Sequence, residues 1–225
     1  MDYQFNYQLF NQPSLAIIID CYDDSHGADY IDVLTNIKFF CEDNPNVVAV
    51  ALATYVDHNL CVINEQPWGF QGADFFCNFT KWDTLSRLWE DAKDNPLNKL
   101  NVKTHPILLN MKKRNDQVFF AAWSDLQILY YCNYINPSIE NIFVFGKHWN
   151  VCLKVRPLGW VSLHNLNHHN LFSKQMNIIS HKKCVIGIDH DATESTNFEI
   201  IFPWHEIDND YLLLSNFDVN QSNSL

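Results

Sequence analysis

Residues 139–153 contain the pattern that decides the fold, and they read Ile139-Glu140-Asn141-Ile142-Phe143-Val144-Phe145-Gly146-Lys147-His148-Trp149-Asn150-Val151-Cys152-Leu153. The β-branched and aromatic run that ends at Gly146 predicts a buried strand followed by a tight turn. Asn150 is a favourable N-cap residue, so a helix is expected whose first turn carries Cys152. Free N–H groups and the dipole at a helix start favour a thiolate, which makes Cys152 a candidate nucleophile. The alternative is a core thiol at a strand-to-helix junction, because free cysteine is among the most buried residue types.

The composition indicates one globular α/β domain over residues 1–225, because hydrophobic residues make up 47% and no Pro-, Gly- or Ser-rich linker divides the chain. No apolar run is long enough for a membrane span, and the first residues lack the pattern of a signal peptide, so a cytoplasmic location is expected. Seven cysteines, an odd number without a C-x-x-C spacing, then indicate reduced thiols. A formal charge of −11 argues against a nucleic-acid partner.

The order of apolar runs predicts a mostly parallel sheet with helices on both faces. Buried strands are expected over 14–20, 47–54, 105–111, 142–145 and 184–189, and 210–214 is a later apolar run. Helices are expected over 30–41 and 125–134, the second with Leu126, Leu129 and Tyr130 facing inward, and a weaker one over 81–92. Residues 160–182 show no clear period and are interpreted as an excursion from the domain.

Three chemically active side chains stand at or beside the predicted strand ends: Asp20, Lys113 and Cys152. Lys112 is the alternative to Lys113, because strand alternation does not separate the two lysines. A carboxylate, an ammonium and a thiol form a sufficient set for acyl transfer. For Asp20 the competing interpretation is a turn cap after a strand, and for the lysines it is a solvated basic turn.

The order along the chain of a strand ending at Asp20, a strand followed by Lys113, and a strand followed by Gly146 and Cys152 resembles that of the isochorismatase-like cysteine hydrolases. This family includes nicotinamidases and N-carbamoyl amide hydrolases. That family commonly has Gly-x-x-Thr-Asp-x-Cys-Val, and this chain keeps the Gly146-to-Cys152 spacing with Trp149-Asn150 in place of Thr-Asp. Residues 69–74 are similar to the family's Gly-Thr-Pro-Gly-Ala-Glu loop, and residues 185–193 to its later strand ending in Asp-Ala. The resemblance spans about residues 14–193 and implies a three-layer α/β/α domain with Rossmann-like topology.

The resemblance also implies roles for individual residues. Asp20 would accept the thiol proton, Lys113 would keep Asp20 ionised, and Cys152 would attack the carbonyl of a small amide or carbamoyl compound to form a thioester. A cis peptide near Lys147-His148 would turn backbone N–H groups toward the oxyanion. The aromatic lining of the substrate pocket would come from Tyr22, Trp68, Phe70, His148 and Trp149.

Departures from the family pattern keep a second hypothesis open. Besides Trp149-Asn150, the chain has Tyr22 where many members have Gln, Arg156 where many have Thr, and Pro157 within a helix that is usually intact. These changes permit a catalytically silent relative that acts as a binding or assembly protein.

No metal or other cofactor is expected. Asp57-His58, His105 and the group His164, His168 and His169 lack a matched set of ligands, so solvated loop histidines are the simpler interpretation. The expected partners are a small-molecule substrate and further copies of the chain, because exposed tryptophans such as Trp82, Trp89 and Trp160 would favour a homo-oligomer. The alternative is that these tryptophans belong to the core.

Overall fold

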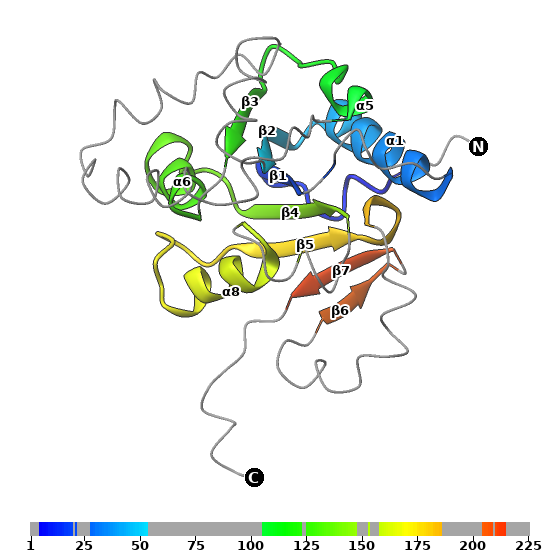
Figure 1. Ribbon diagram of the computed structural model, residues 1–225. Coiled ribbons are helices and arrows are strands. Elements are labelled where there is room, and N and C mark those ends of the chain that lie inside the picture. The colour runs from blue at the N-terminus through cyan, green and yellow to red at the C-terminus, as the bar shows by residue number, and fades with distance from the viewer. Residues whose placement is uncertain are drawn as a thin grey trace, which may run out of the picture.

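The computed structural model describes residues 5–19, 21, 28–53, 105–122, 125–147, 153, 158–185, 204–208 and 210–214. These residues form a mostly parallel seven-stranded sheet with helices, an α/β fold (Figure 1). The strands are β1 Ser14–Ile19, β2 Val47–Ala53, β3 Val118–Ala122, β4 Asn141–Gly146, β5 Asn177–His181, β6 Trp204–Ile207 and β7 Tyr211–Leu214. Their order in the sheet is β3-β2-β1-β4-β5-β7-β6; the β5–β7 and β7–β6 pairs are antiparallel, and the other pairs are parallel.

The central strands are continuous apolar runs because both of their faces are covered. Every residue of β1 and β4 is buried. Leu15, Ile17 and Ile19 of β1 face one hydrophobic cluster, whereas Ala16 and Ile18 face the other. The predicted strands at 14–20, 47–54 and 142–145 are thereby confirmed over their described residues.

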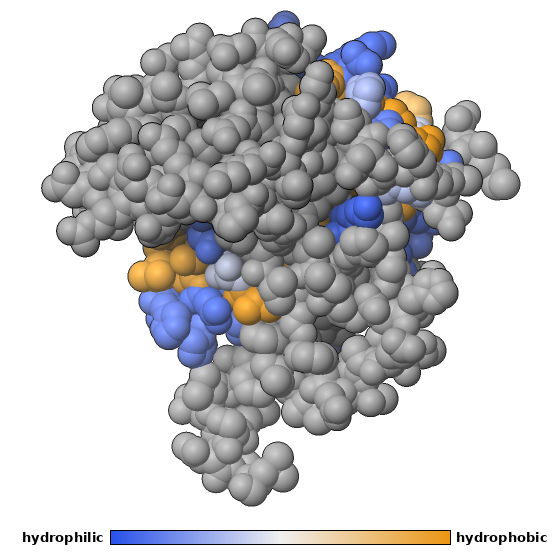
Figure 2. Space-filling model, in the orientation of Figure 1, coloured by the Kyte–Doolittle hydropathy of each residue, from blue (hydrophilic) through white to orange (hydrophobic). Residues whose placement is uncertain are grey.

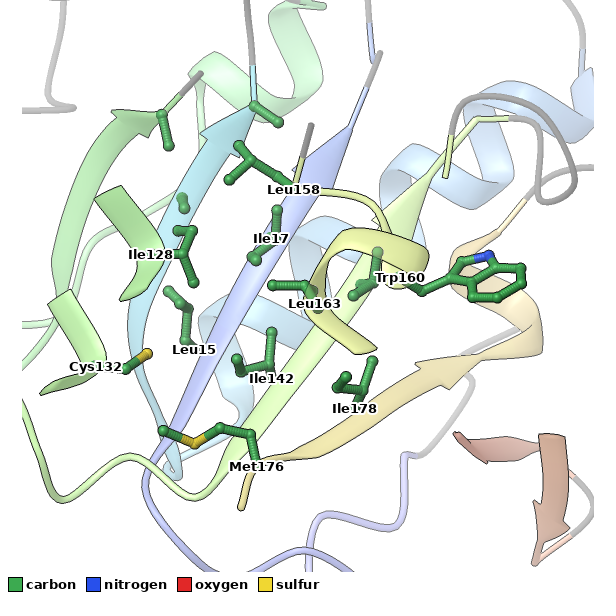
Figure 3. Close-up of a cluster of buried hydrophobic side chains, with 14 of the residues drawn as sticks. Leu15, Ile17, Ile128, Cys132, Ile142, Leu158, Trp160, Leu163, Met176 and Ile178 are labelled. Atoms are coloured by element: carbon green, nitrogen blue, oxygen red, sulfur yellow. The ribbon is translucent and has the colours of Figure 1, made fainter. Parts of the chain in front are cut away.

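Helices contribute to both hydrophobic clusters. On one face lie α1 Ala28–Asp43 and the short α5 Pro106–Leu109, with Leu34, Phe40 and Leu108 in the core. On the other face lie α6 Asp125–Tyr130, its π-helical continuation η2 Tyr131–Ile135 and α8 Trp160–His168. Figure 3 shows Ile128 of α6 and Leu163 of α8 over the β1 and β4 side chains. The predicted helices at 30–41 and 125–134 are confirmed.

Two predictions about elements are wrong. Residues 105–111 form the helical turn α5 instead of a strand, because Pro106 occupies the first turn and His105 accepts a hydrogen bond from the Ile107 N–H as its N-cap. The third parallel strand is β3, later in the chain. Residues 160–182 are not an excursion, since they contain α8 and β5, and β5 pairs with β4.

Smaller differences concern side chains. The inward face of α6 and η2 is formed by Ile128, Tyr131 and Cys132, whereas Leu129 and Tyr130 are only partly buried. Trp160 is 3% exposed and belongs to the core, so it supplies no surface for association. Of the strand predicted at 184–189, Val185 forms a parallel bridge to Gly146, and 186–189 lie outside the described residues.

The described helices include none long and apolar enough to cross a membrane. The surface over α1 mixes hydrophilic and hydrophobic residues (Figure 2), and Ile31 and Phe39 are its exposed large hydrophobic side chains. The predicted helix at 81–92 lies outside the described residues.

Candidate functional site

The candidate site is the end of the sheet at which β1 and β4 terminate. The chain builds β1, β2 and β3 toward one edge and then returns to place β4 on the other side of β1. In open α/β sheets, ligands bind outside the carboxyl ends of the strands at such a reversal of strand order. Ile19 pairs with Gly146, so the described parts of the two strands end level with each other.

Gly146 allows the two strands to approach closely at this end. Its φ is +134°, a conformation that residues with a side chain rarely adopt. A Cβ atom at this position would lie 2.1 Å from the Ile19 carbonyl oxygen. The same oxygen accepts a hydrogen bond of 3.3 Å from the Lys147 N–H. The first residue after β4 is therefore held against the last residue of β1.

Side chains from four separate segments meet at this end of the sheet. The Lys147 ammonium lies 5.3 Å from the centroid of the buried Tyr30 ring, at the start of α1. The His105 ring packs edge-on against the Tyr30 ring, with centroids 6.0 Å apart. The backbone N–H of His105 donates a hydrogen bond of 3.0 Å to the backbone carbonyl of Cys21. The Cys21 thiol donates to the Ile19 carbonyl oxygen at 3.4 Å. A half-buried cation and a tyrosine thus stand beside the ends of β1 and β4.

The two lysines expected at this site lie at the opposite end of the sheet. Lys112 and Lys113 precede β3 and are exposed. The Lys112 N–H donates to the Glu42 carboxylate in the last turn of α1, and the neighbouring Arg114 donates to the Val47 carbonyl, where β2 begins. Since β2 runs from Val47 to Ala53, the two ends of the sheet are about 20 Å apart. The segment predicted to form a strand that carries Lys113 to this site forms the helix α5 instead, which explains why Lys113 lies at the other end of the sheet.

Most of the other predicted site residues lie outside the described part of the chain. These are Asp20, Cys152, His148, Tyr22, Trp68, Phe70 and Trp149. Asp20 follows Ile19 in the sequence, and Cys152 precedes Leu153, which is fully buried against the face of the sheet that α6 and α8 cover. The described residues contain no cis peptide bond, and the Lys147–His148 bond is not among them.

Four of the seven cysteines are described, and all four are free and buried: Cys21, Cys41, Cys132 and Cys184. Burial raises the pKa of Cys132 to about 12, and it also raises the pKa values of Cys41 and Cys184. Thiols of this kind are protonated at neutral pH and react slowly with electrophiles. The cysteines outside the described residues are Cys61, Cys77 and Cys152.

The sequence interpretation missed Tyr30, His105 and Cys21 as neighbours of the site. A tyrosine opening a helix and a histidine before a proline are common in proteins, so no local pattern marks them. Their proximity depends on α1 and the residues before α5 both packing at the carboxyl end of β1. No protein-family model, curated protein or solved structure matches the chain.

Proposed function

We propose that this protein is an isochorismatase-like cysteine hydrolase with the three-layer topology of that family, and that it cleaves a small amide, carbamoyl or related carbonyl compound. The observation that carries the proposal is the pairing of β1 with β4 at the reversal of strand order. Asp20 directly follows the first of these strands in the sequence, and Cys152 comes six residues after Gly146, the last residue of the second. Two strand ends in register supply a rigid support for a base and a nucleophile.

In the proposed reaction, Asp20 accepts the proton of the Cys152 thiol as the sulfur bonds to the substrate carbonyl carbon. The carbon–nitrogen bond then breaks, and the amine leaves with the proton from Asp20. Water hydrolyses the resulting thioester, which releases the acid and restores the thiol. Backbone N–H groups around Cys152 would stabilise the oxyanion, an effect worth about 3 kcal/mol per donor in comparable sites.

A catalytically silent relative is the second candidate, and one observation favours it. The lysine that the family resemblance assigns to catalysis, Lys113 or its neighbour Lys112, is exposed at the far end of the sheet. A relative that had lost the catalytic lysine would retain the fold as a binding or assembly protein. The homo-oligomer and the cytoplasmic location remain predictions under either candidate.

A screen of small amides and ureas for ammonia release distinguishes the two candidates. We expect Cys152→Ala to abolish turnover and to change Tm by less than about 2 °C, because the substitution removes only one sulfur atom. Cys61→Ala and Cys77→Ala are matched controls and should keep their activity. Asp20→Asn should lose turnover as well, since an amide does not accept the proton. Full activity in Cys152→Ala would show that the nucleophile is another group.

A further inference from the structure

The ring of His181 is enclosed by aromatic side chains from three separate segments. Its centroid lies 5.0 Å from that of Phe5, 4.6 Å from that of Tyr211 in β7 and 6.4 Å from that of Phe40 in α1. The strand that carries His181, β5, lies beside β7 in the sheet (Figure 1). The histidine is fully buried. It therefore lies between the sheet, α1 and residues 5–10, which we call the N-terminal segment.

The hydrogen bond at this ring requires a neutral imidazole. The His181 Nδ1 atom accepts from the backbone N–H of Lys183 at 3.2 Å. Because a backbone N–H is only a donor, this Nδ1 carries no hydrogen, and a second proton on the ring would have to bind there. Proton binding would break the hydrogen bond and place a charge among aromatic rings. Burial accordingly lowers the pKa of His181 from its usual 6.5 to about 4.

Other titratable groups surround the ring. The Asp210 carboxylate favours the charged imidazolium, whereas the Lys183 ammonium disfavours it. The remaining titratable groups on the elements packed around the ring, which include η3 Lys182–Cys184, are Tyr7, Cys41, Asp43, Lys182, Cys184, Glu206 and Tyr211. Burial raises the pKa values of Tyr7, Cys41 and Cys184, so these three groups are neutral at and below pH 7.

The N-terminal segment separates from the ring more easily than α1 or β7 does. It forms neither a helix nor a strand, whereas α1 is a helix of 16 residues and β7 pairs with a strand on each side. Side-chain amides contribute to its attachment: Asn46 donates to the carbonyls of Tyr7 and Phe10. Asn6 donates to the Asp208 carboxylate at 2.8 Å. A segment outside the regular backbone ladders opens at lower free energy than the whole domain.

We propose that His181 is an acid-sensitive anchor for the N-terminal segment, and that proton binding at its Nδ1 atom releases residues 5–10 before the sheet unfolds. Release would uncover an aromatic surface on Phe40, Phe143 and Tyr211, which Phe5 and Phe10 contact in the closed form. The inference uses none of the residues of the candidate site and is independent of the proposed function.

The test is hydrogen exchange of the intact protein, followed by mass spectrometry of the peptide that contains the N-terminal segment. Dividing each rate by that of an unstructured chain at the same pH gives a protection factor. The protection factor of the segment should fall about 20-fold between pH 7 and pH 5, because the released ring recovers its usual pKa of 6.5. The peptide from α1 should stay at least about tenfold more protected than the segment at pH 5.

Three variants identify the group that binds the proton. His181→Asn still offers an acceptor to the Lys183 N–H but does not titrate, so the protection factor of its segment should change less than about threefold between pH 7 and pH 5. His205→Asn removes an exposed histidine of β6 and should keep the full response. Asp208→Asn removes the carboxylate that Asn6 contacts, at a φ of 54° that asparagine tolerates, and should keep the response as well.

Each outcome supports the inference or overturns it. An unchanged response in His181→Asn would overturn it, and so would a response lost in Asp208→Asn, which would assign the proton to that carboxylate. An equal fall in the protection of α1 and of the segment would show unfolding of the whole domain, which also contradicts the inference. If His181→Asn does not fold, His181→Gln replaces it, and the same comparison with His205→Asn decides the result.

Discussion

Gly146→Ala is the most direct test of how β1 and β4 are joined at the candidate site. The new Cβ atom would lie 2.1 Å from the Ile19 carbonyl oxygen and 3.0 Å from the Ile19 carbonyl carbon and nitrogen. All three atoms belong to the backbone of a fully buried central strand, so no flexible side chain can move aside. The alanine would also have to adopt a φ of +134° or break the pairing of the two strand ends.

We estimate the cost from two contributions. An unfavourable backbone conformation costs about 1–3 kcal/mol, and forcing an additional methyl group into a packed region costs a further 1–3 kcal/mol or so. The free energy of unfolding should therefore fall by about 2–6 kcal/mol, a large part of the 5–15 kcal/mol that is typical of folded proteins. For a chain of this length the corresponding decrease in Tm is roughly 5–20 °C.

Urea denaturation followed by far-UV circular dichroism measures this loss, provided that the m-value stays constant. Gly159→Ala is the matched control, because the φ of Gly159 is −70°, which alanine adopts without strain. The control should lose less than about 1 kcal/mol, the usual effect of an unfavourable N-cap. A loss below about 0.5 kcal/mol in Gly146→Ala would show that the two strand ends are not held together as described.

Two further predictions concern polar groups away from the site. Arg114 donates hydrogen bonds to five backbone carbonyls at the end of α1 and the start of β2, so Arg114→Met should lower the free energy of unfolding by about 2–4 kcal/mol. Lys113→Met changes an exposed neighbour and should lower it by less than about 0.5 kcal/mol. Equal losses for the two variants in a urea titration would contradict this prediction. Burial lowers the pKa of His181 from its usual 6.5 to about 4, although Asp210 opposes the shift. Because the unfolded chain then binds the proton more readily, this histidine's contribution is complete above about pH 6.5 and is lost as the pH falls toward 4, by about 3 kcal/mol. The decrease in stability between pH 7 and pH 4.5 should be about 2–3 kcal/mol smaller in His181→Asn, whose side chain can still accept the Lys183 N–H, and an unchanged pH dependence would refute this assignment.

The sequence by itself determined the fold class and the positions of the central elements. Strands buried on both faces must be apolar throughout, and β1, β2 and β4 were recognisable from that property alone. The amphipathic period of α1 and the Asn-Pro breakers after α1 and η2 likewise depend on local chemistry. The glycine at the end of β4 was identified for the same reason, since a tight turn after a strand calls for that residue.

The tertiary structure decided which apolar segments became strands. A short run such as residues 106–109 is compatible with either a strand or a helical turn, and only its surroundings select one. β5 lacks an apolar pattern because Ser180 and His181 lie in it, yet both are fully buried. Each forms a hydrogen bond through its side chain. The Ser180 hydroxyl donates to the Val144 carbonyl, which is distant in the sequence, and the His181 ring accepts from the nearby backbone N–H of Lys183.

The location of the positive charge was also decided by the tertiary structure. From the chain order alone, Lys113 or its neighbour Lys112 was expected at the carboxyl ends of the central strands. Sheet topology places Lys113 before β3 and Lys147 after β4, at opposite ends of the parallel strands. Strand direction depends on crossovers between distant segments, and no local pattern of residues specifies it. The sequence could therefore nominate residues for the candidate site, but only the fold shows that Lys147 lies at the end where β1 and β4 terminate and that Lys112 and Lys113 lie at the other end.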